Sequence, residues 1–173
     1  MFTADEVTLQ TGFTAACAAL ARLATGGLVV LLAQDAYGQG GGELLRAGRV
    51  RTLPGTLRLA GVRLGELAVK DGWARLPLRW EATGPGGPFA VLDADLTLVE
   101  AGKYATVVGL AGAYRLPPSL AGAGLDREII GRCAEHTTGD FLGRLACALA
   151  HPAGQPESAG WPVTSVPPAR PVT

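Results

Sequence analysis

The sequence predicts an α+β domain in which a curved antiparallel sheet wraps around a long C-terminal helix, with one or two short helices after the first strand. Strands separated by glycine-containing turns run from Gly65 to Arg115, Pro117-Pro118 ends the last of them, and a helical segment follows over 119–150. An antiparallel sheet that leads into such a helix buries one apolar face against it. We therefore expect a cavity between the sheet and the helix.

Composition limits the chain to one ordinary domain. Its 173 residues are 48% apolar, which is enough for a single core. We assign residues 1–150 to the domain and the proline-rich residues 151–173, with Trp161 as their large apolar side chain, to a disordered tail. Basic and acidic residues balance at 15 each, so the chain lacks the net positive charge that is typical of nucleic-acid-binding proteins.

The cysteines and histidines argue against a metal centre. Cys17, Cys133 and Cys147 have no metal-binding or redox spacing, which predicts buried free thiols and a cytoplasmic location. His136 and His151 are the two histidines, and one of them begins the tail. We expect no metal site.

The N-terminal quarter predicts a strand followed by a helix. Val7 and Leu9 alternate with polar residues over 6–12, the period of a strand. Residues 13–33 have the length of a bilayer span, but the preceding flank is acidic and Gly26-Gly27 divides the run. We predict a buried amphipathic helix, with Thr14 as candidate N-cap, and no stable membrane insertion.

Two segments after this helix are harder to assign. The apolar run 28–37 is short enough for a strand or a second helix, and we favour a helix. The glycines at 38–42 predict a flexible turn, because they lack the lysine and hydroxyl residue of a phosphate loop. Residues 46–64 hold strands with uncertain boundaries.

A hairpin is the clearest local prediction. The segments GELAVK and WARLPLRWEA flank Asp71-Gly72, a pair suited to a two-residue turn with positive φ at both positions. Leu76, Leu78 and Trp80 then share one face of the second strand. Pro77 within that strand predicts an edge or a bulge.

The next strand pairs an apolar face with two carboxylates. Leu92, Ala94, Leu96 and Leu98 alternate with Asp93, Asp95 and Thr97. The two aspartates could form an acid/base pair or bind a metal. We favour a solvated face on which they pair with Arg75 and Arg79 across the hairpin.

The last strand and the closing helix complete the predicted interior. Over 103–115 the even positions are the apolar ones, namely Tyr104, Thr106, Val108, Leu110 and Tyr114. The helix has an apolar stripe made of Leu125, Ile129, Cys133, Phe141, Leu145 and Leu149. His136 lies near the angular position of Ile129, so we expect it to face inward.

The order of elements, together with three stretches of sequence, resembles a known superfamily. The stretches are LPLRWEATGPGGPFAVLDADLTL, GLAGAYRLPPSLAGAGLD and a T-x-x-x-F-L helix at Thr137 to Leu142. They are similar to the START-like helix-grip superfamily of polyketide cyclases and lipid carriers, over residues 6–150. The resemblance implies a cavity between sheet and helix, no obligatory cofactor and no universal catalytic residues.

Three functions are compatible with these observations. The first is binding of a small hydrophobic molecule such as a lipid, a polyketide-like chain or an aromatic compound. The second is a cyclase or dehydratase, with His136 or Tyr114 moving a proton, and the third is an interaction protein with a filled core. For the binding function, the predicted pocket residues are Trp80, Leu92, Tyr104, Leu110, Tyr114, Ile129, Cys133 and His136.

Overall fold

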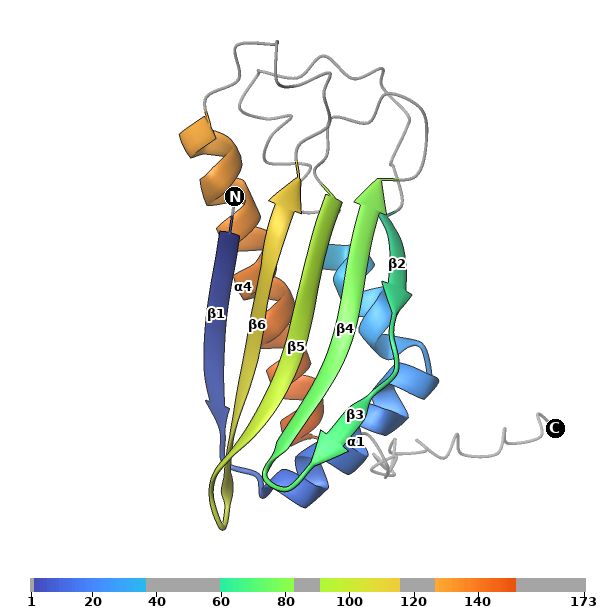
Figure 1. The fold of residues 1–173 in the computed structure, drawn as a ribbon, viewed down its shortest axis with the longest axis vertical. Coiled ribbons are helices and arrows are strands. Elements are labelled where there is room, and N and C mark those ends of the chain that lie inside the picture. Colours follow the sequence, from blue (N-terminus) through green and yellow to red (C-terminus); the bar gives the residue numbers. More distant parts are fainter. Residues whose placement is uncertain (1, 37–59, 83–90, 116–126, 152–173) are drawn as a thin grey trace, which may run out of the picture.

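The structure is a computed structural model that describes residues 2–36, 60–82, 91–115 and 127–151. Its strands form one six-stranded antiparallel sheet in the order β1-β6-β5-β4-β2, with β3 also beside β4 (Figure 1). The strands are β1 (Phe2–Leu9), β2 (Ala60–Leu64), β3 (Ala68–Lys70), β4 (Trp73–Ala82), β5 (Val91–Gly102) and β6 (Ala105–Arg115). The helices are α1 (Phe13–Thr25), the helix Leu28–Ala36 and the C-terminal α4 (Arg127–Ala150).

The described helices all lie against the same face of the sheet, which we call the helix-facing side; the opposite side is the outer face (Figure 1). α4 packs mainly against β1 and β6, and α1 packs against β5. The α+β class and the helix-grip arrangement predicted from the sequence are confirmed.

A buried hydroxyl pair attaches α4 to the edge strand β1. Thr138 Oγ1 donates to the Glu135 carbonyl within α4 at 3.0 Å. The Thr3 hydroxyl lies 3.3 Å from Thr138 Oγ1, and since the Thr138 proton is already used, Thr3 is the donor of this contact. Both side chains are buried, so the pair fixes where the helix crosses the strand.

The N-terminal elements agree with the predicted order but differ in their ends. β1 begins at Phe2 and ends at Leu9, earlier than the predicted range 6–12. α1 is capped by Gly12 without a side-chain hydrogen bond, so the prediction of Thr14 as N-cap was wrong. A Cβ at Gly12 would lie 2.9 Å from the Lys103 carbonyl oxygen, because the β5–β6 turn packs closely against the start of α1.

The apolar segment after α1 is helical, as favoured from the sequence. α1 ends at the C-cap Gly26, Gly27 has a φ of 76°, and the helix Leu28–Ala36 follows. Within the described ranges no single helix is long and apolar enough to cross a membrane. α1 and the following helix together pass that test by length and composition alone, and they are bent by 79°.

The β3–β4 hairpin has the predicted two-residue turn. Lys70 pairs with Trp73 around Asp71-Gly72, which confirms the register. Gly72 has a φ of 68°, whereas no described residue other than glycine has a positive φ, so the expectation of positive φ at both turn positions was wrong for Asp71. A single positive φ at the second turn position is the pattern of a type II turn.

Pro77 sits where the strand beside β4 is interrupted. β2 ends at Leu64, opposite Leu78, and β3 begins at Ala68, opposite Arg75. Between them the Gly65 N–H donates to the Pro77 carbonyl at 2.7 Å. The missing N–H of proline is tolerated at such a break, as the sequence predicted.

Several predictions fall on residues that the structure does not describe. They are the turn at 38–42, the part of 46–64 before β2, the helical extension 119–126 with Leu125, and residues 152–173 with Trp161. The division into a domain and a disordered tail therefore stays a prediction.

Candidate functional site

One cross-strand row at an end of the sheet carries aromatic side chains on the helix-facing side. Trp80 in β4 pairs with Leu92 in β5, which pairs with Tyr114 in β6, and Val62 in β2 lies on the other side of Trp80. We call these four residues the Trp80 row. Trp80 and Leu92 have no exposed surface, and Tyr114 is 8% exposed.

The Trp80 row contains two buried polar atoms. Burial raises the pKa of the Tyr114 hydroxyl well above its ordinary value, so this side chain is protonated at neutral pH. Its hydroxyl is a neutral group in an apolar wall. Trp80 Nε1 is also buried, and it has no hydrogen-bond partner in the described part of the chain. An unsatisfied buried donor costs about 1–3 kcal/mol.

α4 contacts this row through Phe141. The Phe141 ring is fully buried and meets the Trp80 ring at 90°, with 5.2 Å between ring centroids. This edge-to-face geometry is the favourable one for aromatic pairs. The predicted inward orientation of Phe141, Leu145 and Leu149 is confirmed, because all three are buried.

The rows beyond the Trp80 row on the helix-facing side are also closely packed. The next row consists of Leu78, Ala94 and Gly112, and the one after it of Leu76, Leu96 and Leu110. The three side chains of that third row are at most 1% exposed. Leu110 thus lies inside, as predicted, but two rows away from Trp80 and in a leucine layer.

Tyr104 does not line the interior. It lies in the turn between β5 and β6, where 69% of its surface is exposed and Lys103 Nζ stands 5.1 Å from its ring centroid. β6 begins only at Ala105, and the register shifts between Glu100 and Gly102. The two-residue alternation therefore stops before Tyr104, and the prediction that placed it on the apolar face was wrong.

His136 is exposed, so the expectation that it faces inward was also wrong. The buried side of α4 follows Thr138, Leu142, Leu145 and Leu149. At 3.6 residues per turn, His136 is about 200° from Thr138 around the helix. Ile129 and Cys133 belong to α4, but their side chains lie outside the described residues.

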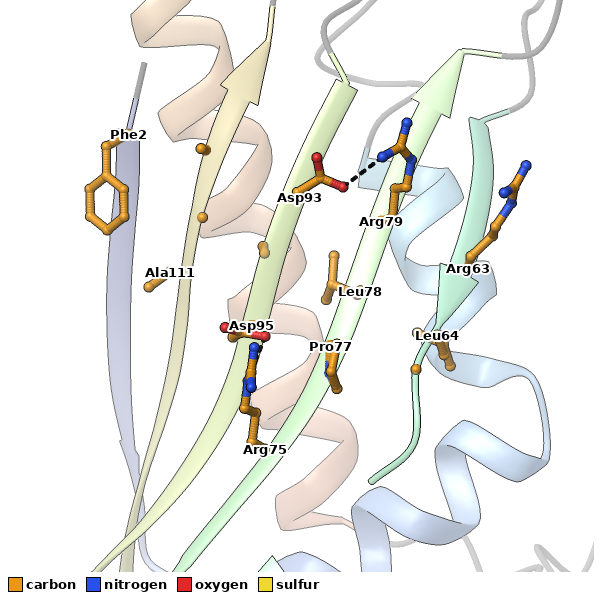
Figure 2. Close-up of a pocket in the computed structure, with 14 residues that line it drawn as sticks. Phe2, Arg63, Leu64, Arg75, Pro77, Leu78, Arg79, Asp93, Asp95 and Ala111 are labelled. Atoms are coloured by element: carbon orange, nitrogen blue, oxygen red, sulfur yellow. Dashed lines mark hydrogen bonds and ion pairs between the residues drawn. The ribbon is translucent and has the colours of Figure 1, made fainter. Parts of the chain in front are cut away.

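The outer face is charged, as the sequence indicated. Arg75 Nε lies 2.8 Å from Asp95 Oδ1, and Arg79 Nη1 lies 3.1 Å from Asp93 Oδ1 (Figure 2). Asp93 also pairs with Arg115. These aspartates pair with guanidinium groups of the neighbouring strands, which confirms the predicted cross-strand pairs.

Two hollows on the outer face were not foreseen. One of about 630 Å³ crosses β4, β5 and β6 between Phe2 and Arg63 (Figure 2). Another of about 300 Å³ lies beside it over Ala4, Thr97 and Gly109. Ala111 lines both hollows. The hollows form where small side chains of β6 cover little of the outer face. The alternation of small residues in β6 was the available signal in the sequence.

The cysteines are not all buried. Cys17 is buried in α1, and burial raises the pKa of its thiol. Cys147 is exposed on α4, which corrects the expectation of buried thiols. Among the described residues no three histidine, cysteine, aspartate or glutamate side chains gather at a candidate metal site.

The fold of this chain is similar to several solved structures. No protein-family model and no curated protein matches the sequence. A conserved protein from Geobacillus kaustophilus is 11% identical, with 87% of this chain and 95% of that one covered and a TM-score of 0.48. A protein of Thermus thermophilus is 14% identical, with 89% and 100% covered and a TM-score of 0.46.

A third similar structure is that of an enzyme. It is the ZhuI aromatase/cyclase from Streptomyces sp. R1128, which is 10% identical over 86% of this chain and 93% of that one, with a TM-score of 0.42. Identities of this size assign neither a family nor an activity to the chain.

Proposed function

We propose that this protein binds a small, largely apolar molecule on the helix-facing side of the sheet, at the end where the Trp80 row lies. The observation that carries the proposal is that Trp80 Nε1 and the neutral Tyr114 hydroxyl gather in one row of an otherwise apolar wall. Ligand pockets combine such a wall with a few polar groups that orient the ligand.

The packing supports a site confined to this end. The leucine row of Leu76, Leu96 and Leu110 is as fully buried as the Trp80 row but has no polar side-chain atom that could orient a ligand, so the Trp80 row is the favoured end. The Trp80 row lies at the end of the sheet, because β4 ends at Ala82 and β5 begins at Val91. Apolar burial would supply affinity at roughly 25 cal/mol per Å², less the cost of association.

A cyclase or dehydratase using the same site receives less support. Its proposed proton carriers were His136 and Tyr114, but His136 is exposed on α4. The raised pKa of Tyr114 makes its hydroxyl a poor general base, because it stays protonated at neutral pH. We therefore favour binding without catalysis.

Binding of the uncharged fluorescent probe N-phenyl-1-naphthylamine tests the proposal. The matched variants are Leu92→Val in the Trp80 row and Leu96→Val in the leucine row, since both positions are fully buried on the same face of β5. We expect saturable binding that Leu92→Val weakens about fourfold, from about 0.8 kcal/mol for one buried methylene, while Leu96→Val changes it less than twofold.

Two results would contradict the proposed function. One is the absence of saturable binding to the folded wild-type protein, which would favour the interaction protein with a filled core. The other is an equal loss in the two variants, since a site elsewhere or general destabilisation would not distinguish Leu92 from Leu96. Circular dichroism and urea unfolding of both variants supply the control for folding.

A further inference from the structure

The indole N–H of Trp80 is a buried donor that the described part of the chain does not use. The whole residue has no exposed surface, and Nε1 has no hydrogen-bond partner there. Tryptophan has a single polar hydrogen and no acceptor, so this atom can only donate. Most buried tryptophans place this N–H on an acceptor.

The contacts of Trp80 explain why its N–H lacks an acceptor. The cross-strand neighbours Val62 and Leu92 are aliphatic and offer none from their side chains. The third contact is the perpendicular Phe141 ring, and an aromatic ring accepts a hydrogen bond only weakly. The backbone carbonyls of β4 and β5 near Trp80 are engaged in the sheet ladder, because both strands are paired on both sides.

The local charges restrict which acceptor fits. On the helix-facing side of the described strands there is no lysine or arginine, because Arg75 and Arg79 of β4 lie on the outer face in pairs with Asp95 and Asp93. A carboxylate placed beside Trp80 would find no counter-charge on this side of the described strands, and a buried carboxylate without one is more costly than a single hydrogen bond can offset. A neutral oxygen carries no such cost.

We propose that Trp80 Nε1 donates a hydrogen bond to a neutral carbonyl oxygen of the ligand, so that the protein selects apolar ketones and quinone-like or ester-like molecules over hydrocarbons of the same shape. Trp80 is then a specificity-determining residue, and this inference rests on the proposed binding function. A site with a buried donor discriminates against the analogue that leaves the donor unpaired.

A pair of isosteric naphthalenes tests the inference. The ketone is 2-acetylnaphthalene, and the alkene is 2-isopropenylnaphthalene, in which a CH2 group replaces the carbonyl oxygen. Affinities are measured by displacement of N-phenyl-1-naphthylamine from wild type, Trp80→Phe and Trp73→Phe. Trp73 is the matched control, since it belongs to the same strand but lies on the outer face.

The quantity compared is the ratio of the alkene Kd to the ketone Kd, which removes the difference in hydrophobicity between the two molecules. We expect Trp80→Phe to lower this ratio roughly fivefold, the value of one net hydrogen bond, and Trp73→Phe to leave it unchanged. An unchanged ratio in Trp80→Phe, with both compounds still bound, would overturn the inference and leave the proposed function standing. Failure of the wild-type protein to bind either compound or the probe would overturn both.

A second measurement does not depend on a folded variant. In 15N-labelled wild-type protein, the Trp80 indole proton should move downfield by several tenths of a ppm with saturating 2-acetylnaphthalene, as expected when an N–H acquires a strong acceptor. The alkene should produce a smaller change. Equal shifts with the two compounds would contradict a hydrogen bond to the carbonyl oxygen.

Discussion

Tyr114 is the ionisable member of the Trp80 row, and its environment gives it a measurable signature. Burial disfavours the phenolate, so the pKa of Tyr114 is raised in the folded protein. In the unfolded chain the same hydroxyl ionises near pH 10. The contribution of Tyr114 to the free energy of unfolding is therefore fully present below about pH 10. It decreases as the pH rises further, because the unfolded chain then releases the tyrosine proton while the folded protein keeps it.

Urea unfolding between pH 8 and pH 11 measures this linkage. We expect the free energy of unfolding of wild type to fall above pH 10 by at most about 1.4 kcal/mol per pH unit from this group, and Tyr114→Phe to lack that component. Tyr104→Phe is the matched control, since Tyr104 is exposed and should keep the wild-type slope. Identical slopes in wild type and Tyr114→Phe would mean that Tyr114 is not buried.

At single positions, sequence periodicity succeeded inside the strands and failed in the β5–β6 turn and on α4. Trp80, Leu92 and Leu110 are buried as predicted, because each belongs to a strand that keeps its two-residue repeat. Tyr104 continues that repeat in the sequence but lies in a turn. His136 was placed by reference to Ile129, yet the packed side of α4 follows Thr138 and Leu142, and only packing against β1 fixes that side.

At the scale of elements, the sheet and α4 place opposite demands on glycine. A Cβ at Gly112 in β6 would lie 2.4 Å from the Ala94 Cβ and 2.5 Å from the Asp93 carbonyl oxygen. A Cβ at Gly143 in α4 would have no heavy atom within 4 Å. The β5–β6 approach therefore needs glycine, whereas the helix position does not.

Gly112→Ala and Gly143→Ala should consequently change stability in opposite directions. We expect Gly112→Ala to lower the free energy of unfolding by about 1–3 kcal/mol through overpacking. Gly143→Ala should raise it by about 0.5–1 kcal/mol, from the helix propensity of alanine. Urea denaturation measures both, and a neutral Gly112→Ala would contradict the close approach of β5 and β6.

The sequence also predicted some elements through their turn chemistry. Asp71-Gly72 and Pro77 marked a hairpin and an interruption, and the structure contains both, since these residues restrict the backbone locally. The charged pairs on the outer face join β4 to β5, as the alternation of charged and apolar residues in these two strands predicted. The hollow beside them crosses β4, β5 and β6, so the small residues of β6 could indicate it only once the order of the strands was known.

For the whole molecule, the topology predicts a gradient of local stability. β5 is paired on both sides, by β4 and β6, and its helix-facing residues are buried in the core. β3 has three residues, all exposed, and pairs with β4. Segments with few buried contacts open locally at low free-energy cost, whereas central strands open mainly on global unfolding.

Native-state hydrogen exchange tests this gradient. We expect the amides of Leu92 to Leu98 in β5 to exchange slowest, close to the rate set by global unfolding, and those of β3 to exchange at least a hundredfold faster. NMR or mass spectrometry of the full chain measures both segments in one sample. Comparable protection of β3 and β5 would contradict the placement of β3 as an exposed edge.

The sequence by itself determined the α+β class, the order of elements from α1 to α4 and the two faces of β4 and β5, because these depend on repeats and turn residues a few positions apart. The tertiary structure alone decided that β1 lies beside β6, that α4 packs on β1 through Thr3 and Thr138, and that Trp80, Leu92 and Tyr114 form one row. Those contacts join residues far apart in the chain, and their register is set by mutual packing that no local repeat encodes.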